Sequence, residues 1–268
     1  MSVRWTQPTT SGLGDRLIDL YMLAAYARAR RVKLYTDWPI YDPKSIDAPY
    51  RVTDILLENV LKFLRFPPEI VFDNHSPTRD FFNHSIGGGG DLNDFYRAYA
   101  SPFCTHDEFK SILAAVAKDF GFCPAIEAFL ETIPPKFVAF HIRRTDRVRN
   151  ETPDGTYIHA SELDWLNNLT FKAIDYYIAQ GYDTFFVCGD EDQKNVPFVE
   201  YIEKVKIKHV FKIPEMPKWQ GTYYDLAVMT RSDFNVTSQR YSSFSRFPSF
   251  IGTGSFTSVC NLNHRGLI

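Results

Sequence analysis

An apolar segment that runs into a cluster of charges, residues 137–146 (FVAFHIRRTD), constrains the fold of this chain more than any other feature. Its apolar half is rich in aromatic and β-branched residues and follows a pair of prolines, which predicts a buried strand. The charged half then lies at the carboxyl end of that strand, where open α/β sheets bind their ligands. A salt-bridge cluster at the surface is the alternative. We favour a pocket for an anion, because Arg143 and Arg144 offer permanently charged, forked donors that match phosphate oxygens.

The rest of the C-terminal half alternates between strand-like and helical patterns. We expect strands at 137–142, 184–188, 209–212 and 234–237, and helices at about 162–180, 195–204, 223–229 and from 242 onward. Such alternation is typical of βαβ units around a parallel sheet, and it therefore predicts the α/β class.

The N-terminal half is less regular. A nearly all-apolar helix is expected at 17–31, followed by a strand at 32–35 and a second helix at 52–64. The rest of 37–110 indicates irregular structure, and the four glycines at 87–90 suit either a plain connector or a ligand loop. Glycine and prolines between 121 and 136 mark a boundary, so we expect two domains, 1–130 and 131–268.

Composition limits the class of partner. A net charge of −2 argues against broad electrostatic binding to nucleic acid or a membrane surface, so the anion should be small. No apolar run approaches the roughly 20 residues that span a bilayer. The four cysteines are widely spaced, without a C-x-x-C pair, which indicates reduced thiols. We therefore expect a soluble, cytoplasmic protein, and a lumenal one only if a membrane anchor has been removed.

Two glycines precede the first helix. The Gly12-Leu13-Gly14 loop lets the backbone approach a phosphate beside the free N–H groups of a helix N-terminus. By itself such a loop is usually a tight turn, in which Asp15 could serve as the N-cap.

A second polar segment, residues 189–192 (GDED), follows a strand. Asp190 and Asp192 could hold a divalent cation on a nucleotide diphosphate, or one of them could cap the next helix. We favour the cap and expect no metal, because the paired arginines can neutralise the phosphates unaided.

A third segment, Ser242-Ser243-Phe244-Ser245-Arg246, lies between the last strand and a helix. Its hydroxyls can cap the helix or bind phosphate oxygens together with the free N–H groups. Both alternatives remain open at this point.

Taken together, these segments resemble the superfamily of fucosyltransferases that use GDP-fucose, most closely the core α1,6 enzymes. The family's H-V-R-R-T-D-K-V motif with a following Glu is similar to His141–Val148 and Glu151. An apolar strand ending in T-D-D is similar to residues 187–191, and D-x-x-x-L-S-x-A-D-F with S-S-x-x-x-R is similar to 225–234 and 242–246. The match covers 137–250 well and 11–31 weakly. Residues 152–157 look like an insertion.

The resemblance implies a GT-B fold, with two Rossmann-like halves, and an inverting transfer of fucose to a glycan acceptor. It makes Arg143 the chief β-phosphate ligand and Glu151 the general base, with Asp146 as the reserve base. It assigns guanine and ribose to His141 and Asp225. The full donor-binding set that it implies is Gly12, Gly14, His141, Arg143, Arg144, Asp225, Ser242, Ser243 and Arg246. No cofactor is expected beyond the donor substrate.

Two rival functions remain open. One is a glycosyltransferase that uses another nucleotide sugar, with a metal held by Asp190 and Asp192. The other is a protein that binds a nucleotide sugar without catalysis, in which Glu151 only pairs with a neighbouring arginine.

Overall fold

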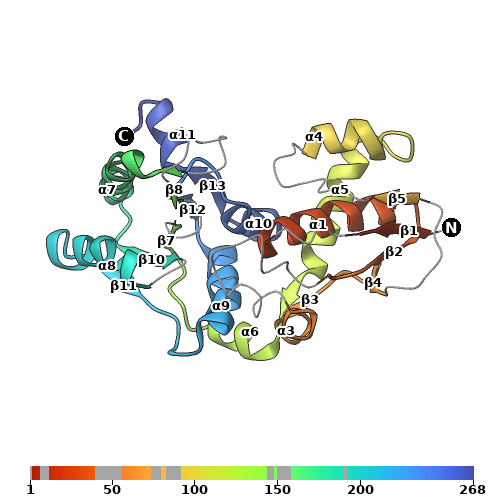
Figure 1. The fold of residues 1–268 in the computed structure, drawn as a ribbon, viewed down its shortest axis with the longest axis horizontal. Coiled ribbons are helices and arrows are strands. Elements are labelled where there is room, and N and C mark those ends of the chain that lie inside the picture. The colour runs from red at the N-terminus through yellow and green to blue at the C-terminus, as the bar shows by residue number, and fades with distance from the viewer. Residues whose placement is uncertain are drawn as a thin grey trace. The chain divides into compact units, whose positions relative to one another are not determined.

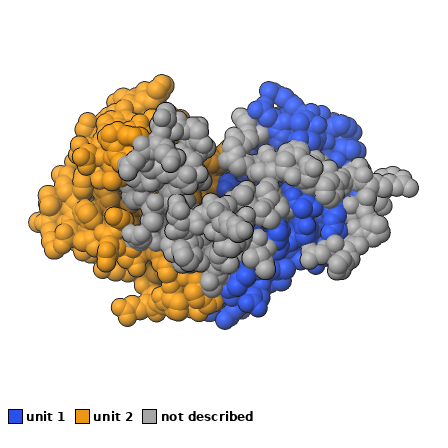
Figure 2. All heavy atoms as spheres, in the orientation of Figure 1, with its two compact units in different colours: residues 1–127 blue, residues 128–268 orange. Residues whose placement is uncertain are grey.

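The computed structural model describes residues 2–6, 12–39, 56–73, 80–82, 92–143, 148–149, 158–189 and 192–268. It divides into two compact units, Met1–Glu127 and Ala128–Ile268, coloured blue and orange in Figure 2. The two units are called unit 1 and unit 2 below.

Unit 1 is built on a parallel four-stranded sheet in the order β4-β2-β1-β5. The strands are β1 (Ser2–Trp5), β2 (Lys33–Thr36), β4 (Ile70–Phe72) and β5 (Asp80–Phe82). Helix α1 (Leu13–Ala29) links β1 to β2, and from Leu13 to Ala27 every residue except Asp15 is buried. A helix that is covered on all sides has no polar face, which explains why apolar residues predominate in its sequence, although Arg16 and Asp19 are buried as well.

The helix predicted at 52–64 is present as α3 (Leu57–Phe63), and residues 51–55 lie outside the described part of the chain. The rest of 37–110 was expected to be irregular, but it contains regular structure: β3 (Leu64–Arg65), α4 (Leu92–Phe95), the π-helical turn η2 (Tyr96–Ala100) and the start of α5 (His106–Asp119). The short elements β6 (Gly121–Phe122) and α6 (Pro124–Leu130) follow. Strand β3 pairs antiparallel with β6.

Helix α5 corrects the expectation of irregular structure most clearly. It begins with a capping box, in which the Thr105 hydroxyl accepts from the Glu108 N–H and the Glu108 carboxylate accepts in return. It buries Phe109, Leu113 and Val116 and packs against α1. The T-x-x-E signal and the apolar spacing were both present in the sequence.

Unit 2 contains a parallel five-stranded sheet in the order β11-β10-β7-β12-β13 (Figure 1). Its strands are β7 (Val138–Ile142), β10 (Thr184–Gly189), β11 (His209–Phe211), β12 (Phe234–Thr237) and β13 (Ser255–Ser258). The first strand along the chain is central, and the order reverses beside it, between β7 and β12. Ligands of doubly wound sheets bind at the carboxyl ends of the strands at such a reversal.

Helices cover both faces of this sheet. The helices are α7 (Leu163–Ala179), α8 (Asp192–Glu200), α9 (Lys218–Arg231), α10 (Ser243–Ile251) and α11 (Val259–His264). Helices α7 and α8 cover one face, and α9 and α10 pack together on the other (Figure 1). Short elements complete the unit: β8 (Val148–Arg149), β9 (Ile158–His159), the 3₁₀ turn η3 (Ala160–Glu162) and the π-helical turn η4 (Tyr201–Val205).

Strand β7 shows how the layers orient the polar residues. All five of its residues are buried, as expected for a strand covered on both faces. Val138, Phe140 and Ile142 join the apolar core beneath α7 and α11. Since side chains alternate along a strand, His141 points to the opposite face, towards α10.

The sequence located the strands of unit 2 better than its helices. Strand β12 has the predicted bounds, whereas α9 begins at Lys218, five residues before the predicted Tyr223, because Pro217 is its extended N-cap residue. Helix α8 begins at Asp192. Strand β13 and α11 were not predicted. Among the described residues, none of the helices has both the length and the apolar character needed to cross a membrane.

Candidate functional site

The carboxyl ends of β7 and β12 bring three predicted segments together. The Ser238 N–H donates to the His141 carbonyl at 3.1 Å, and the Arg143 N–H donates to the Ser238 hydroxyl at 3.3 Å. The Gln239 side-chain amide donates to the Arg143 carbonyl at 2.6 Å. Both main-chain groups of Arg143 are therefore fixed by the segment after β12, and the residue is only 9% exposed.

The first turn of α10 fixes the ring of His141. Ser242 is the N-cap residue, and its hydroxyl accepts from the Ser245 N–H. The Ser245 hydroxyl lies 2.6 Å from His141 Nδ1, and the Ser242 hydroxyl lies 3.4 Å from the same atom. The Phe244 ring lies against the imidazole at 5.2 Å between centroids. Of the two alternatives left open for this segment, helix capping is observed for the Ser242 hydroxyl. The Ser242 and Ser245 hydroxyls also orient a buried histidine two residues before the arginine.

The remaining residues of this segment differ in exposure. Ser243 is buried in the first turn of α10. Arg246 is partly exposed, and its guanidinium lies over the rings of Tyr241 and Phe250. Cation–π contacts of this kind hold the side chain against its own helix.

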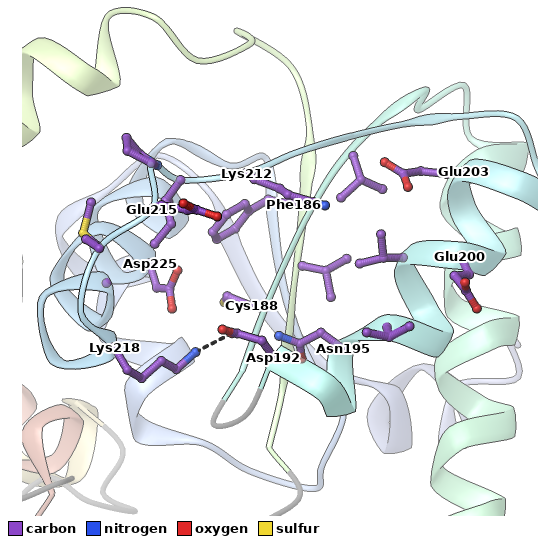
Figure 3. Close-up of a pocket in the computed structure, with 18 of the residues that line it drawn as sticks. Phe186, Cys188, Asp192, Asn195, Glu200, Glu203, Lys212, Glu215, Lys218 and Asp225 are labelled. Atoms are coloured by element: carbon purple, nitrogen blue, oxygen red, sulfur yellow. Dashed lines mark hydrogen bonds and ion pairs between the residues drawn. The ribbon is translucent and has the colours of Figure 1, made fainter.

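Asp225 lines a second polar region, a pocket of about 910 Å³ in unit 2. Its walls come from β10, α8, α9 and the connection between β11 and α9 (Figure 3). Asp225 is 7% exposed, and Lys218 Nζ lies 2.8 Å from Asp192 Oδ1 across the pocket. Apolar side chains, among them Phe186 and Met216, line the same cavity. A concave cavity that combines apolar walls with charged side chains can hold a small molecule that has both apolar and polar parts.

The charge of Asp225 depends on its surroundings. Burial raises the pKa of its carboxyl to about 7; the ammonium of Lys218 opposes this rise, and the carboxylate of Asp192 adds to it. For Lys218, burial by itself would lower the pKa, but attraction to Asp225 and Asp192 outweighs burial and raises it. The lysine is therefore charged at neutral pH, and the acid titrates near neutrality.

Gly189 explains how α8 approaches the sheet. A Cβ atom at this position would lie 2.1 Å from the Ile142 carbonyl oxygen and 2.6 Å from Asn195 Oδ1. Only glycine allows the end of β10 to lie this close to β7 and to the first turns of α8.

Asp192 was predicted to be either a helix cap or a metal ligand, and the structure bears on both roles. It is the first residue of α8, not the N-cap, and its carboxylate pairs with Lys218. Asp190 lies outside the described residues. The described residues contain no group of three or more His, Cys, Asp or Glu side chains placed to hold a metal ion.

The glycine loop lies in unit 1. Gly12 is the N-cap residue of α1, and its carbonyl accepts from the Arg16 N–H at 3.1 Å. Asp15 lies in the first turn of the helix, so its suggested role as N-cap is wrong. Gly14 is a buried helical residue. Phosphate binding by Gly12 and Gly14 stays a prediction.

Several predicted residues lie outside the described part of the chain. These are Arg144, Asp146, Glu151 and the glycines at 87–90. Their roles therefore rest on the sequence resemblance alone.

Sequence reasoning missed Ser238, Gln239 and Lys218. The first two follow β12 directly, as His141 and Arg143 end β7, and this shared position was an available signal. Lys218 lies seven residues before Asp225, two helical turns away on the same face, but the helix was predicted to begin after it.

Comparison with known proteins identifies the fold of the chain. No protein-family model and no curated protein sequence matches the chain. Solved structures do match, and one is the fucosyltransferase NodZ from Bradyrhizobium, at 13% identity and a TM-score of 0.52, covering 94% of each chain. Another is POFUT1 in complex with GDP-fucose, at 14% identity and a TM-score of 0.53, covering 96% of this chain and 98% of that one. NodZ alpha-1,6-fucosyltransferase soaked with GDP-fucose matches at 13% identity and a TM-score of 0.51, covering 94% and 93%. The chain thus has the GT-B fold of GDP-fucose-dependent fucosyltransferases, as its motifs predicted.

Proposed function

We propose that the chain is an inverting glycosyltransferase that transfers L-fucose from GDP-fucose to a hydroxyl group of a glycan or glycoconjugate. One observation carries the proposal. At the reversal of strand order in unit 2, the buried His141 contacts hydroxyls in the first turn of α10, and the main chain of the buried Arg143 is held by Ser238 and Gln239. This cluster belongs to a fold that the chain shares with fucosyltransferases solved with GDP-fucose or GDP.

The donor phosphates are proposed to lie at the first turn of α10. The free N–H groups and positive dipole end of a helix N-terminus attract phosphate oxygens, and Ser242 and Ser243 lie there. Arg143 is the proposed β-phosphate ligand, since its fixed backbone aims a permanently charged fork from the end of β7. Arg144 and Arg246 are proposed as further cations of the donor site.

The nucleoside is proposed to lie along the same edge of the sheet. The Asp225 carboxylate suits the N1–H and exocyclic amine of guanine, because an ionised carboxylate accepts two hydrogen bonds side by side. His141 is proposed to contact the ribose or the base. Ligands of doubly wound sheets bind at the carboxyl ends of the strands, and the Asp225 pocket includes Cys188, near the end of β10.

The proposed reaction is a direct displacement. Glu151 accepts the proton of the acceptor hydroxyl, the acceptor oxygen forms a bond to the anomeric carbon of fucose, and the bond from that carbon to the phosphate oxygen breaks. The electron pair leaves with GDP, and Arg143 stabilises the growing negative charge on the β-phosphate. Attack opposite the leaving group inverts the anomeric centre.

The reaction is proposed to need no metal. Cationic side chains serve the diphosphate, and the carboxylate of Asp192 is engaged by Lys218 at 2.8 Å. Full activity in excess EDTA is the expected result. Loss of activity that Mn²⁺ or Mg²⁺ restores would instead support the metal-dependent rival.

A thermal-shift comparison tests the donor. GDP and GDP-fucose should raise the melting temperature, while UDP and CMP should do little, because a ligand that binds only the folded state stabilises it by mass action. A clear shift with UDP alone would reject fucosyl transfer from GDP-fucose.

The base is tested by two paired variants. Glu151→Gln should keep GDP affinity and lower turnover by about 10²- to 10⁴-fold, because an amide cannot accept the proton. Asp146→Asn is the matched comparison, measured for GDP binding and for transfer. Normal turnover in the first variant and loss in the second would make Asp146 the base. Normal turnover in both would favour an acceptor that brings its own base.

A further inference from the structure

One face of α9 presents a row of pocket residues that the proposed function uses only in part. Lys218, Gly221 and Asp225 lie at positions i, i+3 and i+7, so they share that face, and all three line the pocket. Lys218 and Asp225 are separated by about 10 Å along the helix axis. Helical side chains lean towards the N-terminus, so the Asp225 carboxylate is directed towards the turn that carries Lys218.

The ammonium of Lys218 is held over the pocket. Its Nζ lies 2.8 Å from Asp192 Oδ1, with the Lys218 side chain 34% exposed and the Asp192 side chain 86% exposed. Figure 3 shows the lysine nitrogen directed across the cavity, on the side to which Asp225 also points. An ammonium has three donor hydrogens, and the ion pair with Asp192 takes one of them. The charge is thus anchored at the pocket and keeps donors for a ligand.

Gly221 makes room between the two charges. A Cβ atom at this position would lie 3.2 Å from Ile213 Cδ1, which is tighter than an ordinary contact, and Ile213 itself lines the pocket. The absence of a side chain at Gly221 lets Ile213 pack closely over α9 between the lysine and the acid. Lys218, Ile213 and Asp225 all line the pocket, so a flat ring that packs against the isoleucine can direct one edge towards both charged groups.

We propose that Lys218 donates a hydrogen bond to O6 of the guanine base and so favours 6-oxopurines such as guanine over adenine. The inference rests on the proposed function, because it assumes that the base lies beside Asp225. Guanine carries the O6 acceptor next to its N1–H and 2-amino donors, and this order matches an ammonium beside a carboxylate. Adenine places an amino group where the ammonium donates and a bare nitrogen where the carboxylate accepts. It is therefore rejected by two mismatched contacts.

The test is calorimetric binding to the full chain at pH 7.5, with GDP, 6-thio-GDP and IDP as ligands. The sulfur of 6-thio-GDP is a weak acceptor, whereas its N1–H and amine are those of guanine, so it probes O6 alone. The hypoxanthine base of IDP lacks the 2-amino group, so IDP probes the contact of Asp225. The wild type should prefer GDP to 6-thio-GDP by roughly ten- to a hundredfold, the range for hydrogen bonds to charged groups.

Lys218→Met should reduce that preference to within about twofold, and it should keep a preference for GDP over IDP, smaller than that of the wild type because loss of the ammonium raises the pKa of Asp225. Lys204→Met is the matched control. Lys204 also lines the pocket, but its ammonium pairs with Glu200 one turn away, so its removal should leave both preferences intact. Lys218→Ser is the second variant, since a hydroxyl on one carbon is too short to reach the base.

The outcomes distinguish a failure of the role proposed for Lys218 from a failure of the proposed function. A folded Lys218→Met or Lys218→Ser protein that keeps the wild-type ratio of GDP to 6-thio-GDP overturns the role of Lys218. Equal binding of the two nucleotides by the wild type overturns it as well. In both cases, loss of the preference for GDP over IDP in Asp225→Asn leaves the proposed guanine site standing. Failure of the wild type to bind any guanine nucleotide rejects the proposed function itself.

Discussion

The two polar regions of unit 2 are built from different chemistry. At the ends of β7 and β12, His141 and Arg143 are fixed by hydroxyl, amide and main-chain groups within 3.4 Å. In the pocket beside α9, apolar walls alternate with charged side chains, among which Asp225, Lys218 and Asp192 lie on one side of the cavity. The other charged lining residues are Glu200, Glu203, Lys204, Lys212 and Glu215.

We call the region at the ends of β7 and β12 the prearranged end of the site, and the pocket beside α9 the titratable end. Hydroxyls and amides keep one protonation state across the neutral range. The carboxyl of Asp225, in contrast, has its pKa raised to about 7 by burial. The proposed phosphate contacts should therefore tolerate a change of pH that alters recognition of the base.

Removal of the Arg143 guanidinium should have the largest effect. We expect Arg143→Ala, and also Arg143→Lys, to lower the kcat/KM of fucosyl transfer by about 30- to 1,000-fold, the equivalent of about 2–4 kcal/mol of transition-state stabilisation. Arg240→Ala is the control, because that guanidinium is 62% exposed and pairs with Glu162. Near-normal turnover of Arg143→Lys would mean that the prearranged end has been misidentified.

The titratable end should show itself in the pH dependence of GDP affinity. If base binding needs the ionised carboxylate, affinity should fall as the pH drops through 7, by about 30-fold between pH 8 and pH 5.5. Lys218 stays protonated across this range, and the exposed Asp192 faces the same pocket. Calorimetric titration of wild type and Asp225→Asn separates this effect from titration of the GDP phosphate, which both proteins share. A parallel pH profile in the variant would remove Asp225 from the base site.

The same acid should make the empty protein less stable at high pH. Its folded-state pKa lies above its ordinary value of 3.8, so the folded state holds the proton more tightly, and stability falls as the pH rises from about 4 to 7. Asp225→Asn cannot ionise, so its gain in unfolding free energy over the wild type should be larger at pH 8 than at pH 5, by about 2 kcal/mol. Urea denaturation at both pH values measures this gain. An equal effect at the two values would contradict the raised pKa.

The smallest predicted effect is on stability, and it comes from loss of the hydrogen bond between Ser245 and the His141 ring. Ser245→Ala removes the hydroxyl at 2.6 Å from Nδ1 and should lower the free energy of unfolding by about 1 kcal/mol. Ser249→Ala is the control, because its partly exposed hydroxyl bonds only to the Arg246 carbonyl of its own helix. Chemical denaturation compares the two. A cost for Ser245→Ala no larger than that of the control would show that the histidine is held by packing alone.

The sequence predicted the strands of unit 2 because each has a simple local signature. Strand β7 is continuously apolar and follows two prolines, and it is covered on both faces as that pattern requires. The capping hydroxyl of Ser242 was equally local, since an N-cap bonds within its own first turn. Such features need no knowledge of the remaining chain.

The residues that sequence reasoning missed depend on contacts across the fold. Gln239 donates to the Arg143 carbonyl from 96 residues away. Lys218 interacts with Asp192, which is on α8, and with Asp225, which is on its own helix α9. The spacing of Lys218 and Asp225 on one helix face could be recognised once the start of α9 was known, whereas the contacts of Gln239 with Arg143 and of Lys218 with Asp192 join segments that no local spacing connects. Helix α5, in contrast, could have been predicted, because its capping box and the spacing of its apolar residues are local features of the sequence.

The central position of β7 has a consequence for how unit 2 is made. The strand leaves the ribosome first, yet its neighbour β12 and the serine that holds His141 come about a hundred residues later, with 104 positions between His141 and Ser245. Helix α7 and strand β10 follow within about fifty residues, but at synthesis rates of 5–20 residues per second the edge of β7 that pairs with β12 waits roughly 5–20 s for its partner. The nascent chain therefore carries one unpaired edge of its most apolar strand for most of the translation of this half, which makes it a natural client for chaperones that shield such edges.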